Sequence, residues 1–348
     1  MTNQQEQEEI LIHHLVIHVM NKEQHAHAEL EPSPDEKAVR DASRRLIKDI
    51  TAKYSGRAGK GYGRFEDDRD SYPMGNIADD YYVSKRQNFY DISLRMLNHL
   101  SDRANSEQMS TGGYVLITHI ESDSKEYLLV ALLTATIGST VRNFDVEDSE
   151  YLDISKLRVA GRIDLTSWTE GRERYISFLK GQNSVSAYFK KFLGCNDILI
   201  AKKETEKLRD ALREFVHEQN LEGEDKEEFL NQAHTQLQSL SKTGTPFDIL
   251  TFANELWPSN PEILLEKLSN DELQLSDGFV PDGKVIRDLV SFKGKSRHWT
   301  LKFDREALVD GSVTYDKEND RLLLSQIPEP LRNELLAETD EEEIEEDV

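Results

Sequence analysis

The chain has 348 residues, enough for two or three domains with separate cores, and its formal net charge of -23 excludes a surface that attracts polyanions everywhere. Hydrophobic residues make up 37% and charged residues 31%, a balance that excludes wholesale disorder. The single cysteine, Cys195, excludes an intramolecular disulfide, and the polar N-terminus lacks the pattern of a signal peptide. The longest nearly uncharged apolar run, Tyr127 to Val141, is too short to span a bilayer. We therefore expect a cytoplasmic protein with no membrane partner.

The first third of the chain predicts both strands and helices. Residues Ile10 to Met20 are rich in Ile, Val, Leu and His and predict a strand. Glu36 to Tyr54 has apolar residues at helical spacing and predicts an amphipathic helix. The glycine-rich segment Ser55 to Phe65 predicts a loop, and we expect a second helix from about Ala78 to Asn105.

The next segment carries the best hairpin signal. The apolar runs Gly113 to Glu121 and Lys125 to Thr136 flank the short polar link Ser122-Asp123-Ser124, and Ser and Asp favour a tight turn. Arg158 to Leu165 is a candidate for a further strand of the same sheet. These elements predict a mixed or antiparallel sheet in an N-terminal domain that also contains helices.

The second half predicts helices and then strands. Residues from Val185 to about Leu275 have the three-to-four spacing of helices, whereas Trp299 to Phe303, Ser312 to Tyr315 and Arg321 to Ser325 alternate like strands. The sequence therefore predicts an α+β fold with a helical middle region and a small C-terminal β element. Eight of the last eleven residues are acidic. The expected divisions are a flexible acidic N-terminus at 1–9, an α+β domain at 10–200, a helical region at 201–277, a β-rich element at 278–336 and a disordered acidic tail at 337–348.

Two basic islands stand out in this acidic chain. Between Lys37 and Arg64 there are nine basic residues and two acidic ones, and between Ser155 and Lys203 there are ten and four. Like charges repel when they are gathered together, so such islands favour an anionic partner, with nucleic acid first. The alternative is a solvated helix face beside core aromatics. The aromatics interleaved with the second island are Trp168, Tyr175, Phe178, Tyr188, Phe189 and Phe192.

The glycines at 56, 59, 61 and 63 lie inside the first island. The segment lacks the Gly-Lys-Ser/Thr of a phosphate-binding loop, so it does not predict a nucleotide site. Flexible amides beside Arg57, Lys60 and Arg64 are nevertheless suited to a DNA backbone. A mobile surface loop without a ligand is the alternative.

Catalytic and metal-binding patterns are weak. His14 and His18 have the i, i+4 spacing of a helical zinc site, but in a strand that spacing separates the residues by about 13 Å. Asp164 and Glu173 resemble half of a metal-dependent nuclease site, with Tyr175 where a lysine is expected. We therefore predict a binding protein rather than an enzyme, with no catalytic residues, no metal and no cofactor.

Several stretches together resemble the bacterial nucleoid-associated protein family typified by YejK. The resemblance covers roughly residues 10 to 336 and is carried by Gly112-Gly-Tyr-Val-Leu, Glu126-Tyr-Leu-Leu-Val-Ala-Leu-Leu, Tyr151-Leu-Asp-Ile, Ala160-Gly-Arg-Ile-Asp-Leu-Thr-Ser-Trp168, Tyr175-Ile-Ser-Phe-Leu-Lys-Gly181, Phe192-Leu-Gly194, Leu301-Lys-Phe-Asp304 and Pro330-Leu-Arg332. It implies a nucleoid-located protein that binds double-stranded DNA with little sequence preference. Because relatives of this kind are linked to topoisomerases, it also implies a topoisomerase or other nucleoid proteins as partners. The resemblance assigns no individual site residue.

The charge pattern and the resemblance lead to one hypothesis. The two islands form a joint surface for the phosphates of double-stranded DNA, and a homodimer would double that surface. The alternatives are an adaptor whose main partner is a protein, such as a topoisomerase or a phage-defence component, and more weakly a nuclease. The expected DNA-binding residues are Arg57, Lys60, Arg64, Arg158, Arg162, Arg172, Arg174, Lys180, Lys190 and Lys191.

Overall fold

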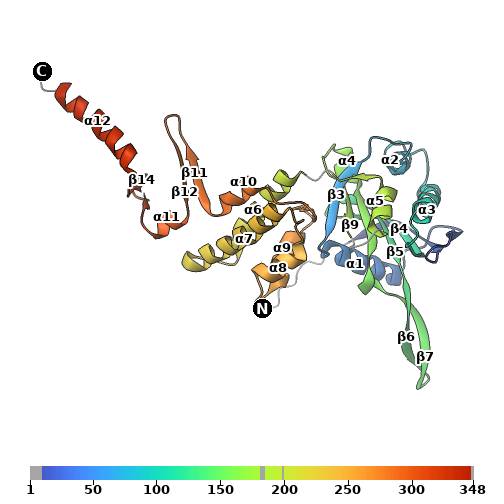
Figure 1. Cartoon of the computed structure of the whole chain (residues 1–348). Helices are drawn as coiled ribbons and strands as arrows, with labels where there is room; N and C mark the ends of the chain where they lie inside the picture. Colours follow the sequence, from blue (N-terminus) through green and yellow to red (C-terminus); the bar gives the residue numbers. More distant parts are fainter. Residues whose placement is uncertain (1–9, 181–184, 198–199, 346–348) are drawn as a thin grey trace.

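An eight-stranded sheet forms the centre of the N-terminal body (Figure 1). The structure is a computed structural model that describes residues 10–180, 185–197 and 200–345. The strands lie in the order β10-β3-β9-β8-β5-β4-β1-β2, and every neighbouring pair is antiparallel. Their bounds are β1 Leu11–Asn21, β2 Glu29–Glu31, β3 Lys60–Phe65, β4 Gly113–Ser122, β5 Lys125–Leu133, β8 Val159–Asp164, β9 Ile176–Leu179 and β10 Cys195–Asn196.

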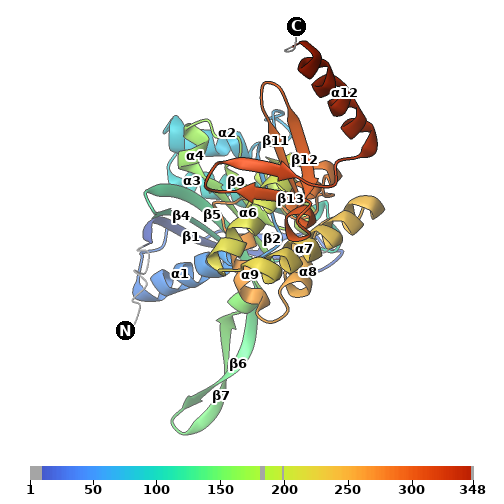
Figure 2. The same ribbon diagram turned by 90° about the vertical axis from the view of Figure 1, so that its left-hand side faces the viewer.

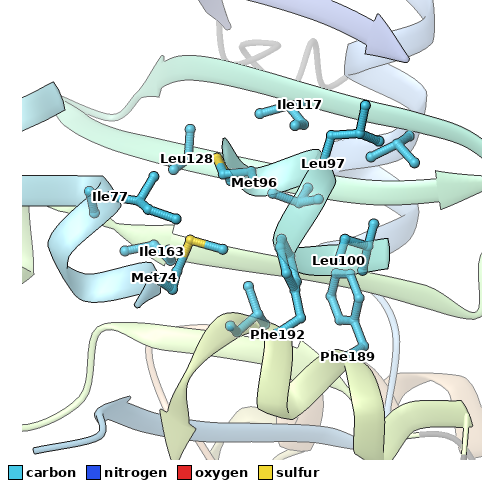
Figure 3. Close-up of a cluster of buried hydrophobic side chains, with 14 of the residues drawn as sticks. Met74, Ile77, Met96, Leu97, Leu100, Ile117, Leu128, Ile163, Phe189 and Phe192 are labelled. Atoms are coloured by element: carbon cyan, nitrogen blue, oxygen red, sulfur yellow. The ribbon is translucent and has the colours of Figure 1, made fainter. Parts of the chain in front are cut away.

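Helices cover both faces of this sheet. Helix α1 (Asp41–Ser55) buries Ile47, Ile50 and Tyr54 against one face. The opposite face is covered by α2 (Met74–Ala78), the π-helix η1 (Asp79–Val83), α3 (Phe89–Asn105), α4 (Leu165–Thr169) and α5 (Val185–Leu193). Figure 3 shows the core on this second side, where methionines and leucines of α2 and α3 meet Phe189 and Phe192 of α5. Alternate strand residues enter the two cores, as the pleat of a sheet requires.

A second body, all helical, has its own core. It contains α6 (Ala201–Glu218), α7 (Gly223–Thr243), α8 (Ile249–Leu256), α9 (Pro261–Ser269), α10 (Gly283–Ile286) and the 3₁₀ turn η3 (Arg287–Leu289). Phe215 and Phe229 stack with ring centroids 5.5 Å apart, and Trp257 packs edge-on against both. Figure 1 shows these helices beside the N-terminal body.

Two hairpins and a long helix follow the helical body. Strand β11 (Ser291–Lys295) pairs with β12 (Thr300–Asp304), and β13 (Val313–Asp316) pairs with β14 (Arg321–Leu324), with α11 (Glu306–Val309) between the hairpins. Helix α12 (Glu329–Glu345) then extends away from both bodies (Figure 1). Part of the tail that we expected to be disordered is therefore helical. The expected flexible segment 1–9 lies outside the described residues.

A two-stranded arm extends from the far end of β5. Strand β6 (Ala135–Arg142) pairs with β7 (Asp145–Leu152) over their whole length, and Figure 2 shows the hairpin projecting into solvent. Asn143 and Phe144 both have positive φ, which is the geometry of a type I′ turn. The sequence analysis did not predict this arm. Its large apolar side chains are exposed, and no other part of the described chain covers them.

The predicted α+β class is confirmed, and the exceptions are local. The hairpin around Asp123 and Ser124 forms as expected, with both residues at positive φ. The expected glycine-rich loop was partly wrong, because its second half is strand β3. The expected second helix is interrupted between η1 and α3. No helix among the described residues is long and apolar enough to cross a membrane.

Candidate nucleic-acid interface

A groove of about 1410 Å³ lies at one end of the sheet. Its walls come from α1, the loop between α1 and β3, the ends of β5 and β9, and the segment before β8, together with parts of α8 and α9. Segments that are distant in sequence meet here because antiparallel strands return the chain repeatedly to the same end of the sheet. The lining includes five cations, Lys53, Arg57, Lys156, Arg158 and Lys180, and two carboxylates, Asp248 and Asp277.

The two predicted basic islands meet in this groove. Arg57, from the first island, and Arg158, from the second, are both exposed and both line it. Lys53 and Lys156 add exposed charge beside them, although Lys156 is also 2.9 Å from Asp153. The sequence analysis did not select these two lysines individually. Both lie within the stretches whose charge it counted.

Lys180 lies in the wall of the groove rather than free in it. Its ammonium donates a hydrogen bond to the backbone oxygen of Asp277 at 2.8 Å and lies 3.8 Å from a carboxylate oxygen of Asp197. Burial lowers the pKa of Lys180, while burial raises the pKa of the Asp277 carboxyl to about 6. Asp277 is therefore mostly ionised at pH 7 and becomes neutral in mild acid.

Three of the expected DNA contacts lie instead between the two bodies, Lys60 buried and two arginines mostly buried. Lys60 is 2% exposed and pairs with Asp271, and Arg162 reaches the same carboxylate at 2.8 Å. Arg174 contacts the fully buried Glu204 of α6 at 2.6 Å. Charges removed from water need such partners. These three cations hold the helical body against the sheet, so their burial removes them from the proposed DNA surface.

The remaining expected residues lie outside the groove. Arg64 lies at the far end of β3 and Arg172 in the turn between α4 and β9. Each is near an acidic neighbour, Asp67 at 3.3 Å and Glu170 at 3.2 Å. On α5, Lys190 pairs with Asp197, whereas Lys191 is exposed. The structure thus brings together Arg57, Arg158 and Lys180 but does not bring the other four into the same cavity.

The glycines of β3 serve packing rather than a ligand. A Cβ at Gly61 would lie 2.5 Å from the Phe178 ring, and one at Gly63 would lie 2.2 Å from the backbone oxygen of Asn196. Neither position can accept a side chain without a shift of its neighbours. The expectation that these two glycines offer amides to a phosphate backbone was therefore wrong, because both residues are buried within the sheet.

The aromatics of the second island also belong to the core. Phe178, Tyr188, Phe189 and Phe192 are buried, and Trp168 and Tyr175 pack against the same cluster. The alternative interpretation, a basic surface beside core aromatics, is the correct one for these six rings. They are not available to stack on bases.

The pair of acidic residues considered for a nuclease is already engaged elsewhere. Asp164 caps α4 by accepting hydrogen bonds from the amide and hydroxyl of Ser167 at 2.7 and 2.9 Å. Glu173 pairs with Lys203 at 3.1 Å. The two carboxylates do not share a cluster of metal-ligating groups in the described part of the chain.

Comparison with known proteins identifies the family of the chain. The family model for nucleoid-associated protein YejK matches residues 16–332. The chain belongs to this family. It is 29% identical over 335 residues to a nucleoid-associated protein of Azotobacter vinelandii, covering 94% of this chain and 99% of that protein. A nucleoid-associated protein of Metapseudomonas resinovorans is 28% identical over 330 residues, covering 93% and 98%. Membership therefore extends over both bodies and not over the sheet alone.

Proposed function

We propose that the protein binds double-stranded DNA in the bacterial nucleoid through phosphate contacts that read little or no base sequence. The observation that best supports this proposal is the groove, where cations of both basic islands line one cavity in a chain of net charge -23. Lys53, Arg57 and Arg158 line the groove in addition to the paired Lys156 and Lys180, and such a gathering of positive charge is unfavourable without an anionic ligand. Family membership supports the same kind of ligand.

Phosphate binding by this groove has a measurable signature. Each phosphate that a cation neutralises releases condensed counterions, so the logarithm of affinity falls with the logarithm of salt by about 0.9 per contact. Phosphate contacts position a protein on DNA but carry no sequence information. Lys53, Arg57, Lys156 and Arg158 are the proposed contacts of the groove, and Arg64, Arg172, Lys190 and Lys191 would extend the surface.

The test is DNA binding across a salt series, followed by fluorescence anisotropy of a labelled duplex. The double variant Arg57→Ala/Arg158→Ala should reduce the magnitude of the salt slope by about 2, because two contacts are lost. The double variant Lys317→Ala/Arg321→Ala removes the same charge from exposed positions of the β13–β14 hairpin and should leave the slope unchanged. Equal effects of both variants, or no binding by the wild type at low salt, would refute the groove as the DNA site.

An adaptor role is the second candidate, and the β6–β7 arm favours it. The arm exposes Ile137, Val141, Phe144, Val146 and Tyr151, and it carries four acidic residues against one basic residue. Apolar exposure of this extent is typical of contacts with proteins, and the acidic charge opposes contact with DNA. Replacing Val141 and Phe144 by serine should leave DNA affinity unchanged if the arm binds a protein, such as a topoisomerase, a phage-defence component or a second copy. A large loss of DNA affinity would assign the arm to DNA instead.

Two further properties are part of the proposal. We expect a homodimer, which sedimentation equilibrium tests directly, and a dimer would present two grooves to one duplex. We also expect no nuclease activity, because Asp164 and Glu173 are each committed to structural contacts. Magnesium-dependent cleavage of plasmid DNA that disappears in Asp164→Ala would contradict this expectation.

A further inference from the structure

Three adjacent strands bring two histidines and a carboxylate together at the end of the sheet opposite the arm. His13 of β1, His119 of β4 and Glu126 of β5 have potential ligand atoms that all lie within 4.8 Å of one another. They lie on the face that η1 and α3 cover, since His119 alternates with Val115 and Ile117 of the same core. This cluster is separate from the groove and plays no part in the proposed DNA contacts.

A β-bulge is responsible for the position of His13. Ile12 pairs with Ile120, and His14 already pairs with His119, so His13 is the extra residue of β1. In a regular strand, His13 and His14 would face opposite sides of the sheet, whereas a bulge re-aims one side chain. Both rings consequently approach His119, with centroid separations of 4.8 Å for His13 and 6.1 Å for His14.

The π-helix η1 positions the other two members of the cluster. Tyr81 lies with its hydroxyl 2.6 Å from Nδ1 of His119, and the Tyr82 hydroxyl donates to Oε1 of Glu126 at 3.0 Å. Such outer hydrogen bonds orient histidine and carboxylate ligands in metal sites. Single π turns inside helices are often found at functional sites. The π turn thus orients His119 and Glu126, and the bulge places His13 beside them.

The inner nitrogen of His119 has no hydrogen bond among the described residues. His119 is 5% exposed, and its Nε2 lies 2.8 Å from a carboxylate oxygen of Glu126, an ion-pair contact whose geometry does not meet that of a hydrogen bond. Because Tyr81 occupies Nδ1, Nε2 is the nitrogen that remains for a metal ion, and it faces the carboxylate of Glu126.

We propose that His13, His119 and Glu126 bind a divalent transition-metal ion of the zinc type. Two imidazoles and one carboxylate are a ligand set that zinc accepts, whereas magnesium and calcium prefer oxygen ligands alone. Around a tetrahedral ion with bonds of about 2.1 Å, ligand atoms are separated by about 3.4 Å. The Nε2 of His13 lies 3.1 Å from Glu121 in an exposed contact. Small side-chain rotations that release this contact bring the ligand atoms to the required separation, since His13 and Glu126 are partly exposed. Water fills the remaining position from the solvent side.

The ion would link β1, β4 and β5 to one another. Zinc therefore stabilises the end of the sheet at which β1 begins. This role does not depend on DNA binding. His14 is held apart from the metal, because its Nδ1 pairs with Glu36 at 2.8 Å and its ring stacks on Phe89.

The experiment is isothermal titration calorimetry of the full chain, freed of metal by chelation, with zinc chloride alone. We expect one zinc ion per chain, and magnesium chloride at the same concentration should give no heat of binding. His13→Ala changes a partly exposed ligand and should weaken zinc binding by at least about 10-fold without unfolding the chain. The matched control is His27→Ala, an exposed histidine outside the cluster, which should bind zinc as the wild type does.

A second variant tests the positioning by η1. Tyr81→Phe removes only the hydroxyl that contacts Nδ1 of His119, so it should weaken zinc binding by about 10-fold while circular dichroism stays unchanged. The visible spectrum of the cobalt-substituted wild type should show the bands of imidazole and carboxylate ligands, and these should be lost in His13→Ala. Wild-type zinc affinity in His13→Ala, or no stoichiometric zinc binding by the wild type, would overturn the proposal.

Discussion

The buried His18 makes the stability of the N-terminal body sensitive to mild acid. Its ring is fully buried on β1, where Nδ1 accepts a hydrogen bond from the backbone N–H of Ser33 at 3.0 Å. The ring proton is therefore on Nε2, which contacts the hydroxyl of Ser93 at 3.1 Å, and that hydroxyl donates in turn to the backbone oxygen of Tyr90. Protonation would set a second N–H against the N–H of Ser33. Burial lowers the pKa of His18 from 6.5 to about 4.

The magnitude follows from linkage between protonation and folding. Because the folded pKa is the lower one, the stabilisation is complete above pH 6.5 and is lost as the pH falls towards 4. At pH 5 protonation of His18 shifts the unfolding equilibrium towards the unfolded chain by about 30-fold, which amounts to about 2 kcal/mol. Between pH 7.5 and pH 5, His18 alone should thus lower the free energy of unfolding by about 2 kcal/mol.

The measurement is urea unfolding at both pH values, followed by circular dichroism, in the wild type and in His18→Asn. The asparagine oxygen can still accept from Ser33, so the variant keeps that hydrogen bond but cannot titrate. The difference between the two pH values should shrink by about 2 kcal/mol in the variant. The exposed His27→Gln should retain the wild-type difference. An unchanged pH dependence in His18→Asn would refute the assignment.

Three other predictions concern charge. Asp271→Ala leaves two buried cations without their carboxylate and should destabilise the chain by about 3 kcal/mol in denaturant unfolding, whereas Asp67→Ala, at an exposed pair, should cost less than about 1 kcal/mol. Since the pKa of Asp277 is about 6, DNA affinity should rise as the pH falls from 7.5 to 5.5, and Asp277→Asn should abolish that rise in anisotropy titrations. Deleting residues 338–348 should tighten DNA binding at low salt, and unchanged affinity would show that the acidic tail does not compete with DNA.

Local patterns predicted the fold where local chemistry decides it. The β4–β5 hairpin follows from two apolar runs around Asp123 and Ser124, and the helices of the middle region follow from apolar residues at helical spacing. Strand β3 was misread because glycine usually signals a loop. In the structure Gly61 and Gly63 are required by close neighbours on β9 and β10, which lie more than a hundred residues away in the chain. No short-range pattern contains that information.

The sequence predicted that the candidate site is basic, but it did not predict which of the basic residues are exposed there. A basic residue looks the same in sequence whether it is exposed, like Arg57, or buried, like Lys60. What separates them is Asp271, a carboxylate contributed by the helical body. The cluster of His13, His119 and Glu126 was missed for a related reason. The sequence pattern compared histidines within one strand, whereas these residues come from three strands, and His13 lies at a bulge.

The burial of Lys60, Arg162 and Arg174 strengthens the argument for a local DNA surface instead of weakening it. Their positive charge is neutralised inside the molecule by Asp271 and Glu204, so the basic islands cannot act as one broad positive face. Four exposed cations of the groove then lie on a molecule whose arm and tail are acidic. Because those acidic parts repel a duplex, DNA should approach only with the groove facing it. The overall charge of -23 would therefore orient the bound protein rather than prevent binding.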